Sequence, residues 1–144
     1  MDRDKVLRFL ALVHIITGLD IILFWAGFYS GILFPLDLLA PRIPNFEGYY
    51  AWETSFTLPD MVLAAAMLWG GVRLWRNTRD RVGRSILLAA SGGAIFLGLL
   101  DATYDSRHGM YGLGHFYSWV LLMIGIYMPA FGIVSIYLLA RDEK

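Results

Sequence analysis

Four long apolar segments divide this chain, and each is long enough to cross the hydrocarbon core of a membrane. They run over about residues 6–29, 58–75, 86–104 and 113–139. A helix rises about 1.5 Å per residue, so roughly 20 apolar residues span a core about 30 Å thick. The chain is 58% hydrophobic and 17% charged, whereas about a quarter of the residues in soluble domains are charged. The sequence therefore predicts a single integral membrane domain over residues 1–144. We expect an all-α, four-helix transmembrane bundle, multi-pass, in the cell membrane if the organism is bacterial or archaeal.

The basic residues predict which ends of the bundle face the cytoplasm, because cytoplasmic loops are enriched in Lys and Arg. Both chain ends carry Lys or Arg, whereas the two remaining loops contain only Arg42 and Arg107. The loop between the second and third segments contains Arg76, Arg79, Arg81 and Arg84. We therefore expect a cytoplasmic N-terminus and C-terminus, with the proline-containing loop and the 105–112 loop outside.

The start of the second helix has two interpretations. Pro59 lies either in the first turn of that helix or at a kink in a longer helix that begins near Tyr49. Proline suits a first turn because it has no N–H to donate, and in a helix interior it removes a hydrogen bond.

Three aspartates lie at nearly one depth in three different helices. Counted from the cytoplasmic ends at about 1.5 Å per residue, Asp20, Asp60 and Asp101 are each about 20–22 Å into the membrane. A charged group in a bilayer is costly, so such residues usually face the interior of the bundle and have a function. The sequence predicts that the three aspartates share a cavity near the outer face.

Small residues follow these aspartates at helical spacing. Positions i, i+4, i+7 and i+11 share one face of a helix, and small side chains there let helices pack closely in lipid. The stripes are residues 60, 64, 67 and 71 on the second helix, and residues 90, 94, 98, 101 and 105 on the third. The aspartates are therefore expected on the packing faces rather than toward lipid.

A second, wetter tier of polar residues is expected above the aspartates, at the outer end. It consists of Glu53, Asp105, Arg107, His108 and His115. Carboxylates this close together cannot all be ionised, so a shared proton could serve as a general acid. An ionised neighbour with aromatic faces would favour a cationic ligand. The same residues could instead relay protons or hold a hard cation.

Structural roles compete with functional ones at several of these positions. Asp60 follows Pro59 and could simply complement the dipole at the start of a helix. Asp101 and Asp105 could pair with Arg107 at a helix end.

The remaining polar candidates also have ordinary interpretations. Glu53 could be an exposed loop carboxylate, and His115 is better explained as a helix-end residue than as a metal ligand. The sequence has no cysteine and no standard metal, phosphate or dinucleotide motif, so it predicts no metal and no cofactor. A net charge of zero gives no reason to expect a nucleic-acid partner.

Three short pieces of the sequence resemble the EXPERA domain, the family of the sigma-2 receptor and the emopamil-binding protein, a sterol isomerase. They are residues 14–15 with Asp20, residues 53–59, and residues 127–129, in the order in which the family has them. The resemblance implies a four-span bundle with both termini inside. It also implies that Glu53 and Asp20 are the acids that face the ligand.

These observations favour the binding of a lipophilic, sterol-like or amphipathic cationic ligand in a pocket near the outer face. The activity could extend to acid-catalysed isomerisation of a double bond in a lipid. Asp20 and Glu53 would be the acid–base or cation-pairing groups. The other ligand-binding candidates are Asp60, Asp101, Asp105, His115, Trp25, Phe56, Tyr104 and Tyr127.

Two other classes stay open: a small proton-coupled carrier or ion-conducting homo-oligomer that uses the same carboxylates, and a structural membrane subunit. A carrier needs a polar path to the cytoplasmic side. Below the aspartates the packing stripes offer mainly Thr17, Met67, Gly71, Ala90 and Ala94. The inner half is therefore expected to be closed and dry, which favours a pocket over a path through the membrane.

Overall fold

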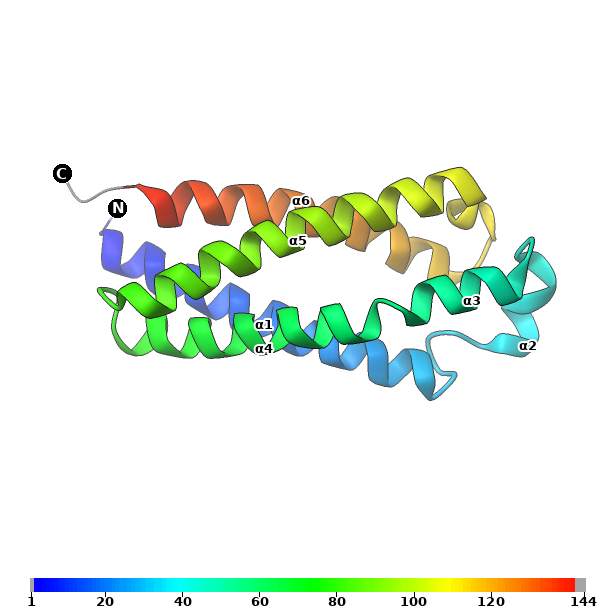
Figure 1. Cartoon of the computed structure of the whole chain (residues 1–144), viewed down its shortest axis with the longest axis horizontal. Coiled ribbons are helices and arrows are strands. Elements are labelled where there is room, and N and C mark those ends of the chain that lie inside the picture. Colours follow the sequence, from blue (N-terminus) through cyan, green and yellow to red (C-terminus); the bar gives the residue numbers. More distant parts are fainter. Residues whose placement is uncertain (1, 142–144) are drawn as a thin grey trace.

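The computed structural model describes residues 2–141, which are almost entirely helical and contain no strand (Figure 1). In chain order the elements are α1 (Arg3–Tyr29), α2 (Leu36–Leu39), the 3-10 turn η1 (Ala40–Arg42), α3 (Phe46–Thr54), α4 (Thr57–Arg76), α5 (Arg81–His108), the 3-10 turn η2 (Met110–Gly112) and α6 (Phe116–Ala140).

Among residues 2–141, four stretches of helix are long and apolar enough to cross a membrane, which confirms the predicted all-α fold with four candidate spans. They are α1, α5, α6 and the stretch Phe46–Arg76, which combines α3 with α4. The start of α1, the end of α6 and the α4–α5 turn lie at the same end of the elongated molecule (Figure 1). The assignment of this end to the cytoplasm stays a prediction.

The second span contains elements of both interpretations of Pro59. A helix does begin early, at Phe46, but it is interrupted at Ser55 and Phe56 before α4 begins. Pro59 is the third residue of α4, so its missing N–H falls in the first turn, where no helical partner is needed.

The turn between α4 and α5 is fixed by Asp80. Its carboxylate accepts hydrogen bonds from the backbone N–H groups of Val82 and Gly83, at 2.9 and 3.1 Å, and so caps the start of α5. The Nε of Arg73, on the last turn of α4, lies 2.9 Å from Asp80 Oδ2. The pKa of Asp80 lies below its usual value of 3.8, mainly because of the Gly83 N–H bond. The charge of Arg73 and the Val82 N–H bond lower it further.

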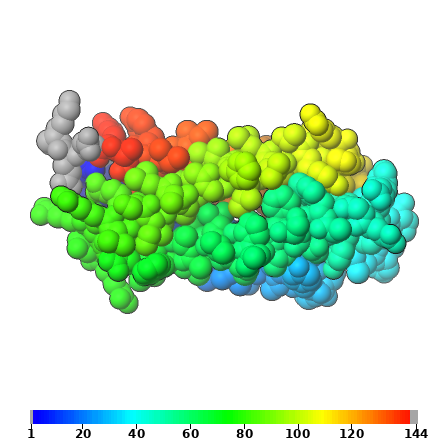
Figure 2. Space-filling view, viewed as in Figure 1, coloured from blue at the N-terminus to red at the C-terminus, as the bar shows by residue number. Residues whose placement is uncertain are grey.

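The helices pack in the order α1, α4, α5, α6, and the backbones of α1 and α6 have the fewest close approaches among these neighbours. Figure 2 shows α3, α4 and α5 covering one long face of the molecule. The predicted packing stripes are confirmed, because their small and apolar members are buried between helices: Ala64, Met67, Gly71, Ala90, Ala94 and Gly98. The few close backbone approaches between α1 and α6 leave a seam between these two helices, which we call the α1–α6 seam.

The end of the bundle opposite the α4–α5 turn, which we call the outer end, is covered by an aromatic cap. Phe34, Tyr49 and Tyr117 are fully buried there, and the Phe34 ring lies 4.8 Å from that of Tyr117 between centroids. The segment from α2 to α3 supplies much of this cap (Figure 1). The cap extends over the last turns of α5.

Helix α5 runs on to His108 and ends at Gly109, which has a φ of +70° that favours glycine. The loop expected at residues 105–112 therefore begins only at residue 109.

Candidate functional site

A cavity of about 490 Å³ lies in the outer half of the bundle. Residues of α1 and α6 line its sides, and α3, α4 and α5 contribute the rest of its wall. Its exposed lining residues belong to α1 and α6, including Asp20, Trp119 and Met123. The cavity therefore opens sideways through the α1–α6 seam, toward the region that lipid would occupy.

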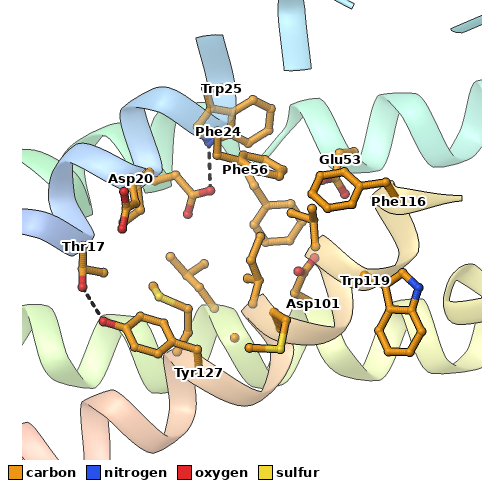
Figure 3. Close-up of a pocket in the computed structure, with 18 residues that line it drawn as sticks. Thr17, Asp20, Phe24, Trp25, Glu53, Phe56, Asp101, Phe116, Trp119 and Tyr127 are labelled. Atoms are coloured by element: carbon orange, nitrogen blue, oxygen red, sulfur yellow. Dashed lines mark hydrogen bonds between the residues drawn. The ribbon is translucent and has the colours of Figure 1, made fainter. Parts of the chain in front are cut away.

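Four carboxyl groups line this cavity: Asp20, Glu53, Asp60 and Asp101. The three aspartates that helical rise placed at one depth thus reach the same space. Figure 3 shows Asp20 on one side of the cavity and Glu53 and Asp101 on the other. Among residues 2–141, no Lys, Arg or His side chain lines the cavity. The site therefore has carboxyl groups without any basic counter-charge.

Asp60 and Asp20 differ in how they are held. The indole Nε1 of Trp25 donates a hydrogen bond to Asp60 Oδ2 at 3.0 Å, across α1 and α4 (Figure 3). Asp60 is partly buried, whereas Asp20 is exposed on the side of the seam. The bond to Trp25 gives Asp60 a tertiary role beyond that of a helix-start residue. Asp20 is the more accessible of the two carboxyl groups.

Glu53 is buried, with 4% of its surface exposed, at the end of α3. The Tyr117 hydroxyl donates to its Oε1 at 3.2 Å, and the hydroxyls of Tyr117 and Tyr49 are 3.0 Å apart. The other oxygen, Oε2, has no hydrogen-bond partner among residues 2–141. The interpretation of Glu53 as an exposed loop carboxylate is therefore wrong, because the aromatic cap covers the end of α3.

Asp105 was expected in a wet tier, and this is also wrong. Its surface is fully buried because α5 continues past it beneath the cap, and neither carboxyl oxygen has a hydrogen-bond partner among the described residues. Asp105 does not line the cavity. Just beyond the helix end, burial and then the nearby charges of Asp105 and Asp101 raise the pKa of Tyr111 to about 12.

Two further candidates lie outside the cavity. The Nδ1 of His115 accepts a hydrogen bond from the backbone N–H of Tyr117 at 3.1 Å and caps α6, as its helix-end interpretation expected. Tyr104 stacks between Trp52 and His108, with ring centroids 3.6 and 3.9 Å away. By contrast, the candidates Trp25, Phe56 and Tyr127 all line the cavity.

Of the α6 residues in the cavity wall, the sequence prediction included Tyr127 but missed the others. Phe116, Trp119, Val120, Met123 and Tyr127 line one wall. Their spacing of three and four residues is that of a single helical face, which was the signal available in the sequence. In a uniformly apolar membrane helix this spacing is easily overlooked.

Thr17 and Tyr127 close the inner end of the cavity. Their hydroxyls are hydrogen-bonded at 2.6 Å across the seam between α1 and α6 (Figure 3). Thr17 is buried, whereas Tyr127 is 41% exposed and reaches the seam from α6. This hydrogen bond is a cross-link between two helices whose backbones make few close approaches.

The inner half contains more buried polar groups than the packing stripes indicated. His14 is fully buried, with Nδ1 2.9 Å from the carbonyl oxygen of Leu10 and Nε2 3.3 Å from Ser91 Oγ. The Ser91 hydroxyl also donates to the Leu87 carbonyl at 2.7 Å. These groups bond to carbonyls of their own helices and cross-link α1 to α5, which is a core role.

In the part of the chain that the structure describes, no three His, Asp or Glu side chains are arranged to hold a metal ion. The fold and the site together define the class of protein. It is a helical bundle with four candidate membrane spans and a carboxyl-lined cavity that opens sideways. Comparisons with family models, curated proteins and solved structures gave no match, so the functional argument rests on the residues themselves.

Proposed function

We propose that this chain binds a lipophilic, cationic small molecule inside the membrane, in the cavity lined by Asp20, Glu53, Asp60 and Asp101. The ligand enters from the bilayer through the seam between α1 and α6. Its apolar part contacts the aromatic and aliphatic wall, and its ammonium group lies among the carboxyl groups.

The observation that carries this proposal is the combination of lateral opening and unbalanced charge. Four carboxyl groups face one cavity that has no basic lining residue. Charged groups within a membrane normally pair with one another or with a ligand. A cation from outside the chain would supply the missing partner, and a lipophilic one would concentrate in the bilayer beside the opening.

The surrounding side chains suit an ammonium group attached to an apolar body. Phe24, Trp25, Phe56 and Phe116 lie around the carboxyl groups. Aromatic faces attract cations, the more so when the cation is away from water. Glu53 Oε2, buried and without a partner, provides an acceptor for an N–H donor.

The resemblance to the EXPERA domain supports the same assignment, since it implies that Asp20 and Glu53 are the ligand-facing acids. Acid-catalysed movement of a double bond is the finer form of the proposal. It requires one cavity-facing carboxyl group to hold a proton beside the ligand. Glu53 suits this role, because it lines the cavity and the Tyr117 hydroxyl occupies Oε1, while Oε2 has no hydrogen-bond partner among residues 2–141.

The test is equilibrium binding of a hydrophobic amine to the purified protein in nanodiscs, compared among wild type, Asp20→Asn and Glu53→Gln. Each substitution should weaken binding by about 1.5–3 kcal/mol, the scale of a hydrogen bond to a charged group. This corresponds to roughly 10- to 150-fold in the dissociation constant.

Asp37→Asn is the matched control, because Asp37 is an exposed aspartate on α2 outside the cavity. It removes the same charge from the same half of the chain and should leave binding unchanged. If wild type binds no amine, or if Asp20→Asn and Glu53→Gln bind as wild type does, the proposal is wrong. Proton flux in liposomes that Asp20→Asn abolishes, without amine binding, would favour the carrier instead.

A further inference from the structure

A second hollow lies along the same seam, toward the inner end of the bundle. It has a volume of about 270 Å³ and a lining of apolar side chains apart from the Tyr127 hydroxyl. The residues that line it come only from α1 and α6: Phe9, Leu10, Val13, Tyr127, Ala130, Phe131, Val134 and Leu138. We call this hollow the seam groove.

The seam groove adjoins the acidic cavity. Tyr127 lines both, and its hydrogen bond to Thr17 stands at the boundary between them. The bond crosses between α1 and α6, the two helices that pack least against each other (Figure 3). Its rupture would join the two spaces without disturbing the tightly packed α1–α4 or α5–α6 pairs.

The distance from the acidic cavity to the far end of the seam groove defines what the two spaces can hold together. From Asp20 to Phe9 along α1 is about 16 Å at 1.5 Å per residue, roughly half the 30 Å thickness of a bilayer core. That is the length of a chain in one leaflet. The groove follows the contact line of two helices and has little more than half the volume of the acidic cavity.

We propose that the seam groove holds the single alkyl chain of the ligand, whose cationic head lies in the acidic cavity. This inference rests on the proposed function and deepens it, because it assigns the ligand to long-chain alkylamines rather than to compact, sterol-like amines. A compact ring system fills the cavity and leaves the groove empty. A chain-bearing amine occupies both spaces and passes the Thr17–Tyr127 bond.

The experiment compares two primary amines in nanodiscs by calorimetric titration: dodecylamine, which has a long chain, and adamantylamine, which is compact. Ala130→Trp fills the seam groove, since Ala130 is exposed on α6 and lines the groove but not the cavity. Ala65→Trp is the control, because Ala65 is exposed on α4 and lines neither space.

We expect Ala130→Trp to weaken dodecylamine binding about tenfold or more, because several methylene groups lose their apolar contacts. Adamantylamine binding should be unchanged, and Ala65→Trp should affect neither amine. Equal weakening of both amines, or no effect on dodecylamine while wild type binds it, would overturn the assignment of the tail but leave the acidic site standing. Failure of wild type to bind either amine would remove the proposed function itself.

Tyr127→Phe provides a second test that adds no bulk. It removes the hydroxyl that bonds Thr17 while keeping the ring against Phe131, which it stacks at 5.4 Å between centroids. Dodecylamine should then associate about twofold faster or more, since the boundary no longer holds a hydrogen bond that must break. Adamantylamine, which does not pass this boundary, should gain less in association rate than dodecylamine, so the ratio of the two rates should rise about twofold or more. Equal acceleration of both amines would contradict the tail path.

Discussion

The contact between α5 and α6 depends on the absence of a side chain at Gly132. A Cβ atom at this position would lie 2.5 Å from the carbonyl oxygen of Ser91 and 2.6 Å from Cγ1 of Ile95. Ordinary contacts of a Cβ atom are 3.4–4 Å, and contacts under 3.0 Å essentially never occur. The Ile95 side chain can rotate, but the Ser91 oxygen belongs to the helix backbone. Gly132→Ala must therefore push the two helices apart by about half an ångström, a change that well-packed interiors resist.

The magnitude follows from a comparison with Gly92, in the same part of α5. A Cβ at Gly92 meets nothing within 4 Å. Alanine in place of glycine stabilises a helix interior by about 0.5–1 kcal/mol, and this gain is common to both positions. The difference between Gly132→Ala and Gly92→Ala is therefore the packing penalty alone, which is about 1–3 kcal/mol for an overpacked contact.

The assay is reversible unfolding in mixed micelles with increasing denaturing detergent, followed by circular dichroism. Gly92→Ala should be as stable as wild type or more stable, and Gly132→Ala should be less stable than Gly92→Ala by the stated amount. If both variants have the same free energy of unfolding, the close approach of α5 and α6 at Ser91 is wrong. The arrangement of α6 as a wall of the cavity would then be wrong with it.

Two further predictions concern the ends of the bundle. Because the pKa of Asp80 is lowered, its contribution to stability is present above the usual value of 3.8 and is lost as the pH falls through the lowered value. Asp80→Asn lacks the charge opposite Arg73, so it should flatten the fall in melting temperature between about pH 6 and pH 2. An unchanged profile would contradict this role. Tyr117→Phe removes the donor to Glu53 and leaves a second buried carboxyl oxygen without a partner. The free energy of unfolding, measured by chemical denaturation, should therefore fall by about 1–3 kcal/mol. A variant as stable as wild type would show that the hydrogen bond is dispensable.

The spans and their packing faces could be predicted because both follow from local arithmetic. A run of apolar residues and a fixed helical rise are enough to place Asp20, Asp60 and Asp101 at one depth. Small residues spaced by four and three place Ala94 and Gly98 between helices. No knowledge of the partner helix is needed for either step.

The outer end could not be predicted in the same way, because burial there is imposed from elsewhere in the chain. Asp105 and Glu53 occur in polar stretches that are typical of a loop. Their burial results from the cap around Phe34 and Tyr49, whose contacts bring together segments far apart in the sequence. Local composition carries no record of such contacts, so both residues were expected to be wetter than they are.

The pair formed by Thr17 and Tyr127 illustrates a second limit. The two residues are 110 positions apart, and each is ordinary in its own helix. Their meeting depends on the rotation and register of α6 against α1, which are set by the glycine contacts of α5 with α6 and by α1 packing on α4. Periodicity defines a face of one helix, but it leaves open which residue of another helix lies opposite.

The buried acids argue that this bundle is not arranged for stability alone. Glu53 Oε2 and both oxygens of Asp105 have no hydrogen-bond partner among residues 2–141, and no basic side chain lines the cavity beside them. A buried polar group without a partner costs about 1–3 kcal/mol by mutational measures, so apolar residues of similar size would give a more stable bundle. Departures of this kind from local rules are typical of functional sites. The aromatic cap and the close α5–α6 contact offset the cost by apolar burial, and the cap holds Glu53 in the wall of the cavity.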